Sequence, residues 1–147
     1  MKTSVAFKKT KFISLALAVS FASLLAQDLS DDYKQGVMYY SKFRGGVIED
    51  MYISKDDIIA LQRDGVLPNG AKIVVEEYFN EGGKKGALNR YIAMQKRGKA
   101  WEFMPYNADK SVNLNDNPAR CKDCHTSSIS GEDKVFSIDR IKSYKLK

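Results

Sequence analysis

The sequence has 147 residues, which at about 100–200 residues per domain is enough for one domain. It contains 24 lysines and arginines against 18 aspartates and glutamates, a formal net charge of +6. Four of the lysines lie in the first 26 residues, which contain no acid, so residues 27–147 hold 20 basic and 18 acidic side chains. Nucleic-acid binding needs a concentrated basic surface, and this near balance of charge argues against it.

Residues 1–26 have the layout of a secretory signal peptide. Their lysines precede an apolar stretch, Phe12 to Ala26, which ends in a small residue. Because this stretch is shorter than the about 20 residues that cross a bilayer, we expect cleavage after Ala26 and no stable membrane insertion afterwards. An uncleaved N-terminal anchor is the alternative. Residues 27–147 are then expected to form a single domain in the periplasm, a compartment where disulfides persist.

Two helices are expected next. From Asp28 to Phe43, apolar residues recur at helical spacing, and Gly45 and Gly46 would end this helix. A short apolar segment, Val47 to Ile53, is expected to be a strand. A start that resembles a capping box and a terminal glycine then predict a second helix over Lys55–Asp64.

Three strands joined by turns follow the second helix. The segments Ala71–Phe79, Leu88–Lys96 and Trp101–Tyr106 are rich in β-branched and aromatic residues, and glycine-containing turns separate them. Consecutive strands joined by short loops form an antiparallel meander. The sequence therefore predicts an α+β fold with two N-terminal helices, an antiparallel β-meander and, after a polar loop over residues 107–118, a C-terminal segment with a C-x-x-C-H motif.

This motif is Cys121-Lys122-Asp123-Cys124-His125, which contains both cysteines and the only histidine of the chain. C-x-x-C-H is the spacing of covalent attachment to a c-type haem. Two thiols about one helical turn apart reach the two vinyl groups on one edge of the porphyrin, and the next residue places an imidazole under the iron. We therefore expect one covalently attached haem c, with His125 as the proximal ligand of the iron.

Other uses of these residues are less consistent with the sequence. A zinc site needs a fourth ligand, normally a third cysteine or a second histidine, and the chain has neither. A thioredoxin-like disulfide is expected at a helix start within an early βαβ unit, whereas this motif lies near the C-terminus. A disulfide remains the main alternative to haem attachment.

The sixth ligand of the iron decides between functions. Because the chain has no second histidine, methionine is the usual choice in an electron carrier. The candidates are Met38, Met51, Met94 and Met104, each of which is also suited to core packing. An open sixth position would instead indicate a haem that binds a ligand or performs catalysis.

The order of these features resembles the cytochrome P-460 family, which includes the cytochromes c-prime-beta. Ordinary small cytochromes c are all-helical and carry the haem motif near the mature N-terminus, whereas here it follows the β-meander. Besides the haem motif, the stretches that look like the family are Phe43-Arg44, Met51-Tyr52-Ile53, Leu67 to Tyr78, Ala93 to Arg97 and Trp101-Glu102-Phe103.

The resemblance implies a five-coordinate haem with an open distal face. Family members either oxidise hydroxylamine or bind nitric oxide without turnover, so a small nitrogen-oxide ligand or substrate is expected. An oxidoreductase would also need a redox partner protein to remove electrons. Electron transfer through a Met-ligated haem is the alternative, and a homodimer is compatible with the sequence.

The catalytic branch of the family has a lysine bonded to the porphyrin edge and a distal carboxylate, whose help as a general base is worth about 10²–10⁴ in rate. The lysine is expected in the strand after the Pro-x-Gly turn, where Lys72 lies, although a valine of this strand is an equal match. Strand alternation puts Lys72 and Glu76 on the face opposite Ile73 and Val75. Glu102 and Glu76 are candidates for the carboxylate.

Two further groups of residues are implied at the haem. Arg120, which precedes the motif, is the best candidate to pair with a haem propionate, because guanidinium matches carboxylate in a bidentate way. The gas-binding branch crowds its distal pocket with phenylalanines. The candidates here are Phe43, Tyr78, Phe79 and Phe103.

Overall fold

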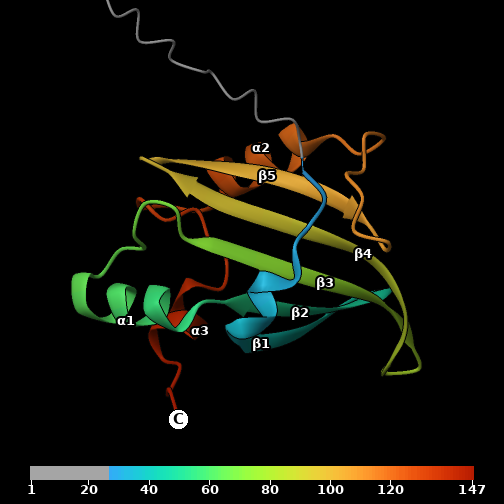
Figure 1. Ribbon diagram of the computed structural model, residues 1–147, viewed down its shortest axis with the longest axis horizontal. Coiled ribbons are helices and arrows are strands. Elements are labelled where there is room, and N and C mark those ends of the chain that lie inside the picture. Colours follow the sequence, from blue (N-terminus) through green and yellow to red (C-terminus); the bar gives the residue numbers. More distant parts are fainter. Residues whose placement is uncertain (1–26) are drawn as a thin grey trace, which may run out of the picture.

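The computed structural model describes residues 27–147, so the predicted signal peptide lies outside the described residues. Its centre is an antiparallel sheet in which each strand pairs with the next along the chain, in the order β1-β2-β3-β4-β5 (Figure 1). The strands are Val37–Arg44 (β1), Val47–Ile53 (β2), Lys72–Glu81 (β3), Lys84–Arg97 (β4) and Ala100–Asn107 (β5).

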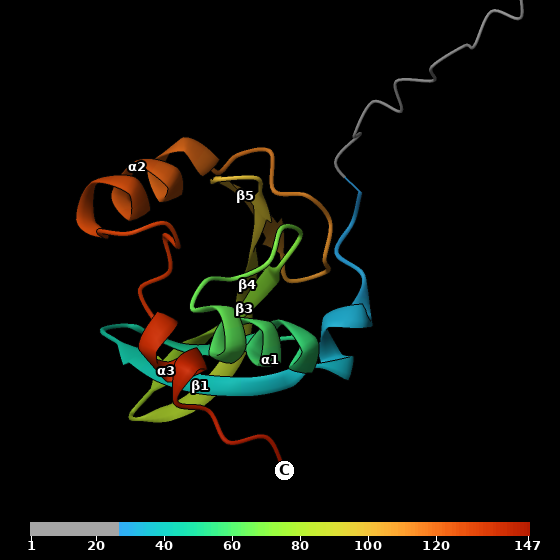
Figure 2. The ribbon, with the colours of Figure 1, turned by 90° about the vertical axis from the view of Figure 1, so that its left-hand side faces the viewer.

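Short helices flank the sheet on both sides. A 3-10 helix, η1 (Asp31–Gln35), precedes β1, and α1 (Lys55–Asp64) connects β2 to β3. After β5 come α2 (Pro118–Ser128) and α3 (Ile138–Lys142). Figure 2 shows α2 and the segment that follows it on one side of the sheet and η1 on the other. This arrangement confirms the α+β class, and no helix in residues 27–147 has the length and hydropathy to cross a membrane.

The predicted first helix, Asp28 to Phe43, is wrong. Only Asp31–Gln35 is helical, and β1 pairs with β2 from Val37 to Arg44. A Cβ atom at Gly36 would lie 2.3 Å from the carbonyl oxygen of Ile53. The backbone at Gly36 therefore approaches the end of β2 more closely than a residue with a side chain would allow. Strand pairing outweighs the helical spacing of the apolar residues, and within residues 27–147 one α-helix precedes β3 instead of two.

The second predicted helix is confirmed at both ends. The side chain of Ser54 accepts a hydrogen bond from the backbone N–H of Asp57 (3.0 Å), and Gly65 ends α1 with a φ of 79°. The meander is confirmed as well, with β4 beginning already at Lys84. A short glycine turn joins β3 to β4 and another joins β4 to β5.

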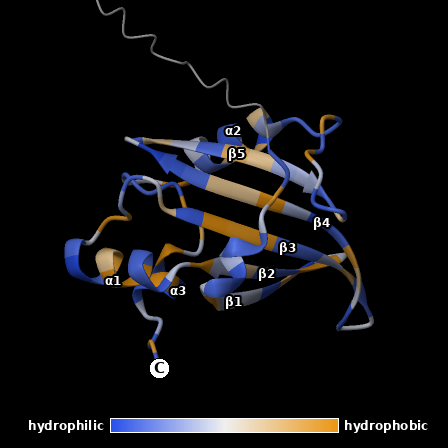
Figure 3. Ribbon diagram, viewed as in Figure 1, coloured by the Kyte–Doolittle hydropathy of each residue, from blue (hydrophilic) through white to orange (hydrophobic). Residues whose placement is uncertain are grey.

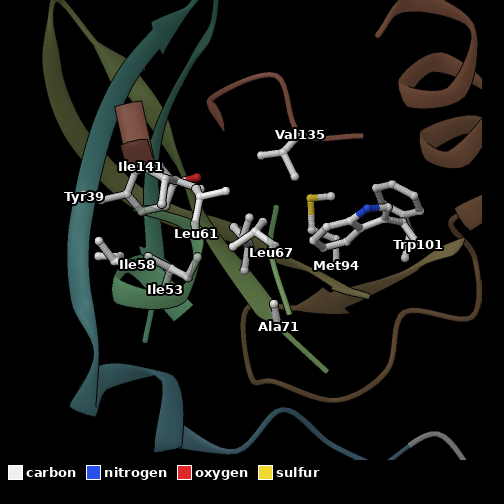
Figure 4. Packing of buried hydrophobic residues seen from close by; sticks show 12 residues of the cluster. Tyr39, Ile53, Ile58, Leu61, Leu67, Ala71, Met94, Trp101, Val135 and Ile141 are labelled. Carbon is white, nitrogen blue, oxygen red and sulfur yellow. The ribbon is translucent and has the colours of Figure 1, made fainter. Parts of the chain in front are cut away.

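Each face of the sheet has its own hydrophobic core. Figure 3 shows that the middle of β3 and β4 is strongly apolar. We call the face that carries Ile73 and Met94 the site face; it packs with α1, α3 and Val135 in the larger core (Figure 4). We call the face that carries Val74 and Ala93 the η1 face, because it packs against Tyr33 and Leu29. The predicted alternation along β3 is therefore confirmed.

A buried carboxylate links η1 to the sheet. Glu76, on the η1 face, is 2% exposed and accepts hydrogen bonds from the hydroxyls of Tyr33 (2.6 Å) and Tyr78 (2.7 Å). It also forms an ion pair with Lys34. Burial by itself would raise the pKa of Glu76, but its hydrogen bonds with Lys34 and the two tyrosines outweigh burial, so that the pKa lies below the ordinary value of 4.5.

Replacing Glu76 by glutamine tests this link. Because an uncharged amide is a weaker acceptor for these donors, Glu76→Gln should lower the free energy of unfolding at neutral pH by about 1–3 kcal/mol. The stabilisation by the charged carboxylate is fully present above the ordinary pKa of 4.5, which applies to the unfolded chain. It is lost as the pH falls through the lower pKa that Glu76 has in the folded protein. Urea denaturation in neutral and acidic buffer should thus show the difference from wild type shrinking in acid. A difference that stays constant would contradict the role of the charge.

Candidate functional site

The C-x-x-C-H motif lies in α2, which faces the site face of the sheet (Figure 2). The side chain of Asn117 caps this helix by accepting a hydrogen bond from the backbone N–H of Ala119 (3.0 Å), and a proline opens its first turn. Residues three and four apart share a helix face, so Cys121 lies on the same face as Cys124 and His125. This helix has no buried residue, which leaves its inner side open to a cavity.

The three motif side chains line one cavity of about 470 Å³. Its size falls in the range of about 300–1,000 Å³ that is typical of ligand and cofactor sites. One wall consists of α2 and the chain from Val135 to Ser137. The other wall is the sheet, whose apolar lining residues are Met51, Ile73, Val75, Ile92, Met94 and Phe103.

The imidazole of His125 is held in one orientation. Its Nδ1 lies 2.7 Å from the carbonyl oxygen of Lys134, and because a carbonyl only accepts, Nδ1 must carry the hydrogen. The rings of Phe103 and Phe136 pack edge-on against it, with centroid distances of 4.8 and 4.7 Å. Burial lowers the pKa of His125 and favours the neutral ring. Nε2 is therefore unprotonated and available to a metal.

The cavity is apolar over most of its sheet wall and charged at one end. Lys42, Glu49, Glu77 and Arg90 lie directly opposite one another across β1 to β4. All of this row except Glu77 line the cavity. Further charged lining residues are Arg44, Asp116 and Arg120. An apolar cofactor with carboxylates on one edge suits this division.

Arg90 and Arg120 play different parts at the charged end. Arg90 donates from Nε to Glu77 (2.9 Å) and from a terminal nitrogen to Asp116 (2.6 Å), so it ties the sheet to the loop before α2. Arg120 makes no ion pair within residues 27–147 and lines the cavity. Its guanidinium is thus free to pair with a carboxylate of a bound group, as the sequence suggested.

Glu49 is a site residue that the sequence analysis missed. It lines the cavity, is only 6% exposed, and has Arg44 as an ion-pair partner at 3.4 Å. Burial raises the pKa of Glu49, and the charge of Arg44 compensates only in part. A buried carboxylate with a raised pKa beside a cavity is suited to accept a proton. Alternation along β2 with Met51 was the signal that could have found it.

The structure does not bring Lys72 or Glu102 to the cavity. Lys72 lies on the η1 face, where its Nζ contacts Asp32 at 3.0 Å. Glu102 is exposed and pairs with Arg97 at 3.3 Å. Glu76 is also on the η1 face, whereas Val75 of the same strand lines the cavity. The alternation of strand side chains explains why the lysine and both predicted carboxylates point away from the cavity.

The methionine and aromatic candidates divide in the same way. Met51 and Met94 line the cavity, and Met38 and Met104 do not. Of the aromatic residues expected to crowd a distal pocket, only Phe103 lines the cavity, where it packs against His125. The others are absent from the cavity lining and are Phe43, Tyr78 and Phe79.

These donors fit a covalently attached haem. Cys121 and Cys124 are free thiols beside an imidazole whose Nε2 is available, and an apolar wall faces them. Burial raises the pKa of Cys121, which favours its thiol form. By contrast, no three histidine, cysteine, aspartate or glutamate side chains within residues 27–147 are grouped closely enough to hold a bare metal ion.

The protein-family model described as Cytochrome P460 matches residues 30–137. This range contains η1, the whole sheet, α2 and the segment that binds Nδ1 of His125. No curated protein matches the chain.

The position of Lys72 makes a prediction about the haem peptide. Because Lys72 lies on the η1 face, Lys72→Ala should leave the mass of the haem-bearing proteolytic peptide unchanged. Mass spectrometry of wild type and variant measures this, with Cys124→Ala as the control that must change the attachment. Loss of a second haem-linked peptide in Lys72→Ala would show that the lysine reaches the porphyrin.

Proposed function

The chain belongs to the cytochrome P460 family, and on this premise we propose that it is an exported, periplasmic c-type cytochrome with one five-coordinate haem that binds nitric oxide. When bound, the haem supplies an iron site for small nitrogen oxides. Cys121 and Cys124 would hold it through thioether bonds, and Nε2 of His125 would be the proximal ligand. Arg120 would pair with a propionate.

The apolar sheet wall of the cavity carries this proposal. Ile73, Val75 and Ile92 line it, and aliphatic side chains neither bind iron nor exchange protons. Such a wall excludes water and admits small uncharged ligands, which nitric oxide is. The lysine of the catalytic branch has no counterpart on the site face of β3, because Lys72 lies on the other face. Ligand capture is therefore favoured over turnover.

One observation favours a second function, the oxidation of hydroxylamine. Glu49 is a buried carboxylate on the cavity wall, and its raised pKa suits a group that removes protons from a bound substrate. Electrons would then have to leave to a redox partner protein. Glu49 would take the part that the sequence analysis assigned to Glu102 or Glu76.

Optical spectra of the haem-loaded protein test the proposal. We expect a high-spin ferrous spectrum without a strongly red-shifted Soret band, which changes when nitric oxide is added. Met51→Leu and Met94→Leu should leave the spectrum as it is, because neither sulfur ligates the iron of a five-coordinate haem. A low-spin spectrum with a Met–iron charge-transfer band, lost in one of these variants, would instead identify an electron carrier. A colourless protein from cells that attach haem would contradict every haem function.

A hydroxylamine assay separates the two family functions. The nitric oxide proposal predicts no sustained oxidation of hydroxylamine by the wild type with an electron acceptor present. If oxidation is observed, Glu49→Gln should lower its rate about 10²–10⁴-fold, the usual worth of a general base. Glu102→Gln is the matched control, because this glutamate is exposed and away from the cavity. Equal rates in both variants would exclude Glu49 as the base.

A further inference from the structure

A lysine near the end of β4 is almost completely buried. Lys96 is 2% exposed, although lysine is rarely buried unless it is paired. Its Nζ donates hydrogen bonds to the carbonyl oxygen of Leu67 (2.8 Å) and to the carboxylates of Asp133 (2.8 Å) and Glu132 (3.1 Å). Burial by itself would lower the pKa of Lys96, but Asp133 and Glu132 outweigh burial and raise it, so the amine stays charged.

Asp133 is held through both of its carboxylate oxygens. One accepts from Lys96, and the other accepts from the backbone N–H of Leu67 at 2.8 Å. Asp133 lies in the irregular stretch, residues 129–137, that leads from α2 to α3, and we call residues 133–137 the proximal segment. Its far end is fixed too, because the hydroxyls of Ser137 and Tyr39 are hydrogen bonded at 2.7 Å.

The middle of the proximal segment contacts the site. The carbonyl of Lys134 accepts the hydrogen bond from His125, and the ring of Phe136 packs against the imidazole. Val135, between them, is buried and lines the cavity. The segment thus carries the groups that orient the imidazole, and it has no helix or strand of its own to hold it in place before α3.

We propose that the buried Lys96–Asp133 pair positions the Lys134 carbonyl and thereby sets the hydrogen bond that orients His125 for iron binding. Asp133 precedes Lys134 directly, so any movement of Asp133 displaces the accepting carbonyl. A hydrogen bond to the second nitrogen of a ligating histidine fixes the ring and strengthens its donation to the metal. Neither Lys96 nor Asp133 lines the cavity, so both act through Lys134 as positioning residues.

An ion pair suits this task better than apolar packing. Desolvation of both charges offsets most of their attraction, so a buried pair adds little net stability, but removal of one partner leaves a buried charge uncompensated. Four hydrogen bonds converge on Lys96 and Asp133, which leaves Asp133 little freedom of position. The inference concerns how the proximal ligand is held and rests on the proposed haem function.

The test compares Lys96→Met and Asp133→Asn with Lys85→Met in the haem-loaded protein. Lys85 also pairs with a buried aspartate, Asp50, but on the η1 face and away from the proximal segment. Resonance Raman spectroscopy of the ferrous protein measures the Fe–His stretching frequency. Proton NMR measures how fast the hydrogen on Nδ1 of His125 exchanges with deuterium.

We expect both variants of the Lys96–Asp133 pair to shift the Fe–His band to lower frequency. Exchange of the Nδ1 hydrogen should become about tenfold faster, as loss of one hydrogen bond implies. Lys85→Met should lose stability without either change. If the variants of the pair lose stability only, with band and exchange rate like those of Lys85→Met, the positioning role is overturned.

A milder variant covers the case in which the pair variants do not fold. Glu132 is 44% exposed, so Glu132→Gln removes the negative charge of one partner of Lys96 without leaving a fully buried group unpaired. It should shift the band and the exchange rate in the same direction by less, and no shift would overturn the inference. A wild type without haem, or with a low-spin ferrous haem, would contradict the proposed function instead. The exchange rate of the Nδ1 hydrogen would then still decide on the positioning role.

Discussion

The hydrogen bond from Nδ1 of His125 to the carbonyl of Lys134 determines what the site can do. It assigns the hydrogen to one nitrogen of the only histidine and leaves the other available to a metal. The same bond joins α2 to the proximal segment, so the helix that carries the cysteines and the segment beneath the imidazole form one unit. His125 lines the same cavity as the apolar wall and the charged end, so the orientation of its ring determines how a bound cofactor lies between them.

The sheet keeps two charged regions apart. On the η1 face, Glu76 is bound by two hydroxyls and a lysine, which links η1 to the sheet. On the site face, Glu49 lies beside the cavity, and burial raises its pKa although Arg44 is 3.4 Å away and Lys42 lies opposite on β1. Two strand residues of the same type thus differ in chemistry because neighbouring elements supply donors on one face and a cavity on the other. Strand alternation makes this division possible.

Local signals in the sequence were sufficient for part of this structure. The caps at Ser54 and Gly65 marked α1, and turn residues marked β3 to β5, because these depend on neighbours in the chain. The edge strand β1 was missed, since its residues also fit a helix and only pairing with β2 decides. The motif in α2 was visible as spacing, and alternation with Met51 could have indicated Glu49. The burial of Lys96 and the position of the proximal segment depend instead on contacts between residues far apart in sequence. Lys72 lies on the face that strand alternation predicted for it, and its ion pair with Asp32 depends on η1, which the sequence did not reveal.

The structure of α2 ties cofactor and fold together. It has 11 residues and none of them is buried, so capping by Asn117 is its main local support. Helices of this length are marginal without tertiary packing. The inner contacts of α2 are few and come mainly from Cys121 and His125. Thioether bonds from both cysteines and an iron bond from His125 would add to them. A group that binds only the ordered helix adds its binding free energy to the stability of that helix. We therefore expect the folding of α2 and the binding of the cofactor to be coupled, with the proximal segment ordered before the cofactor binds.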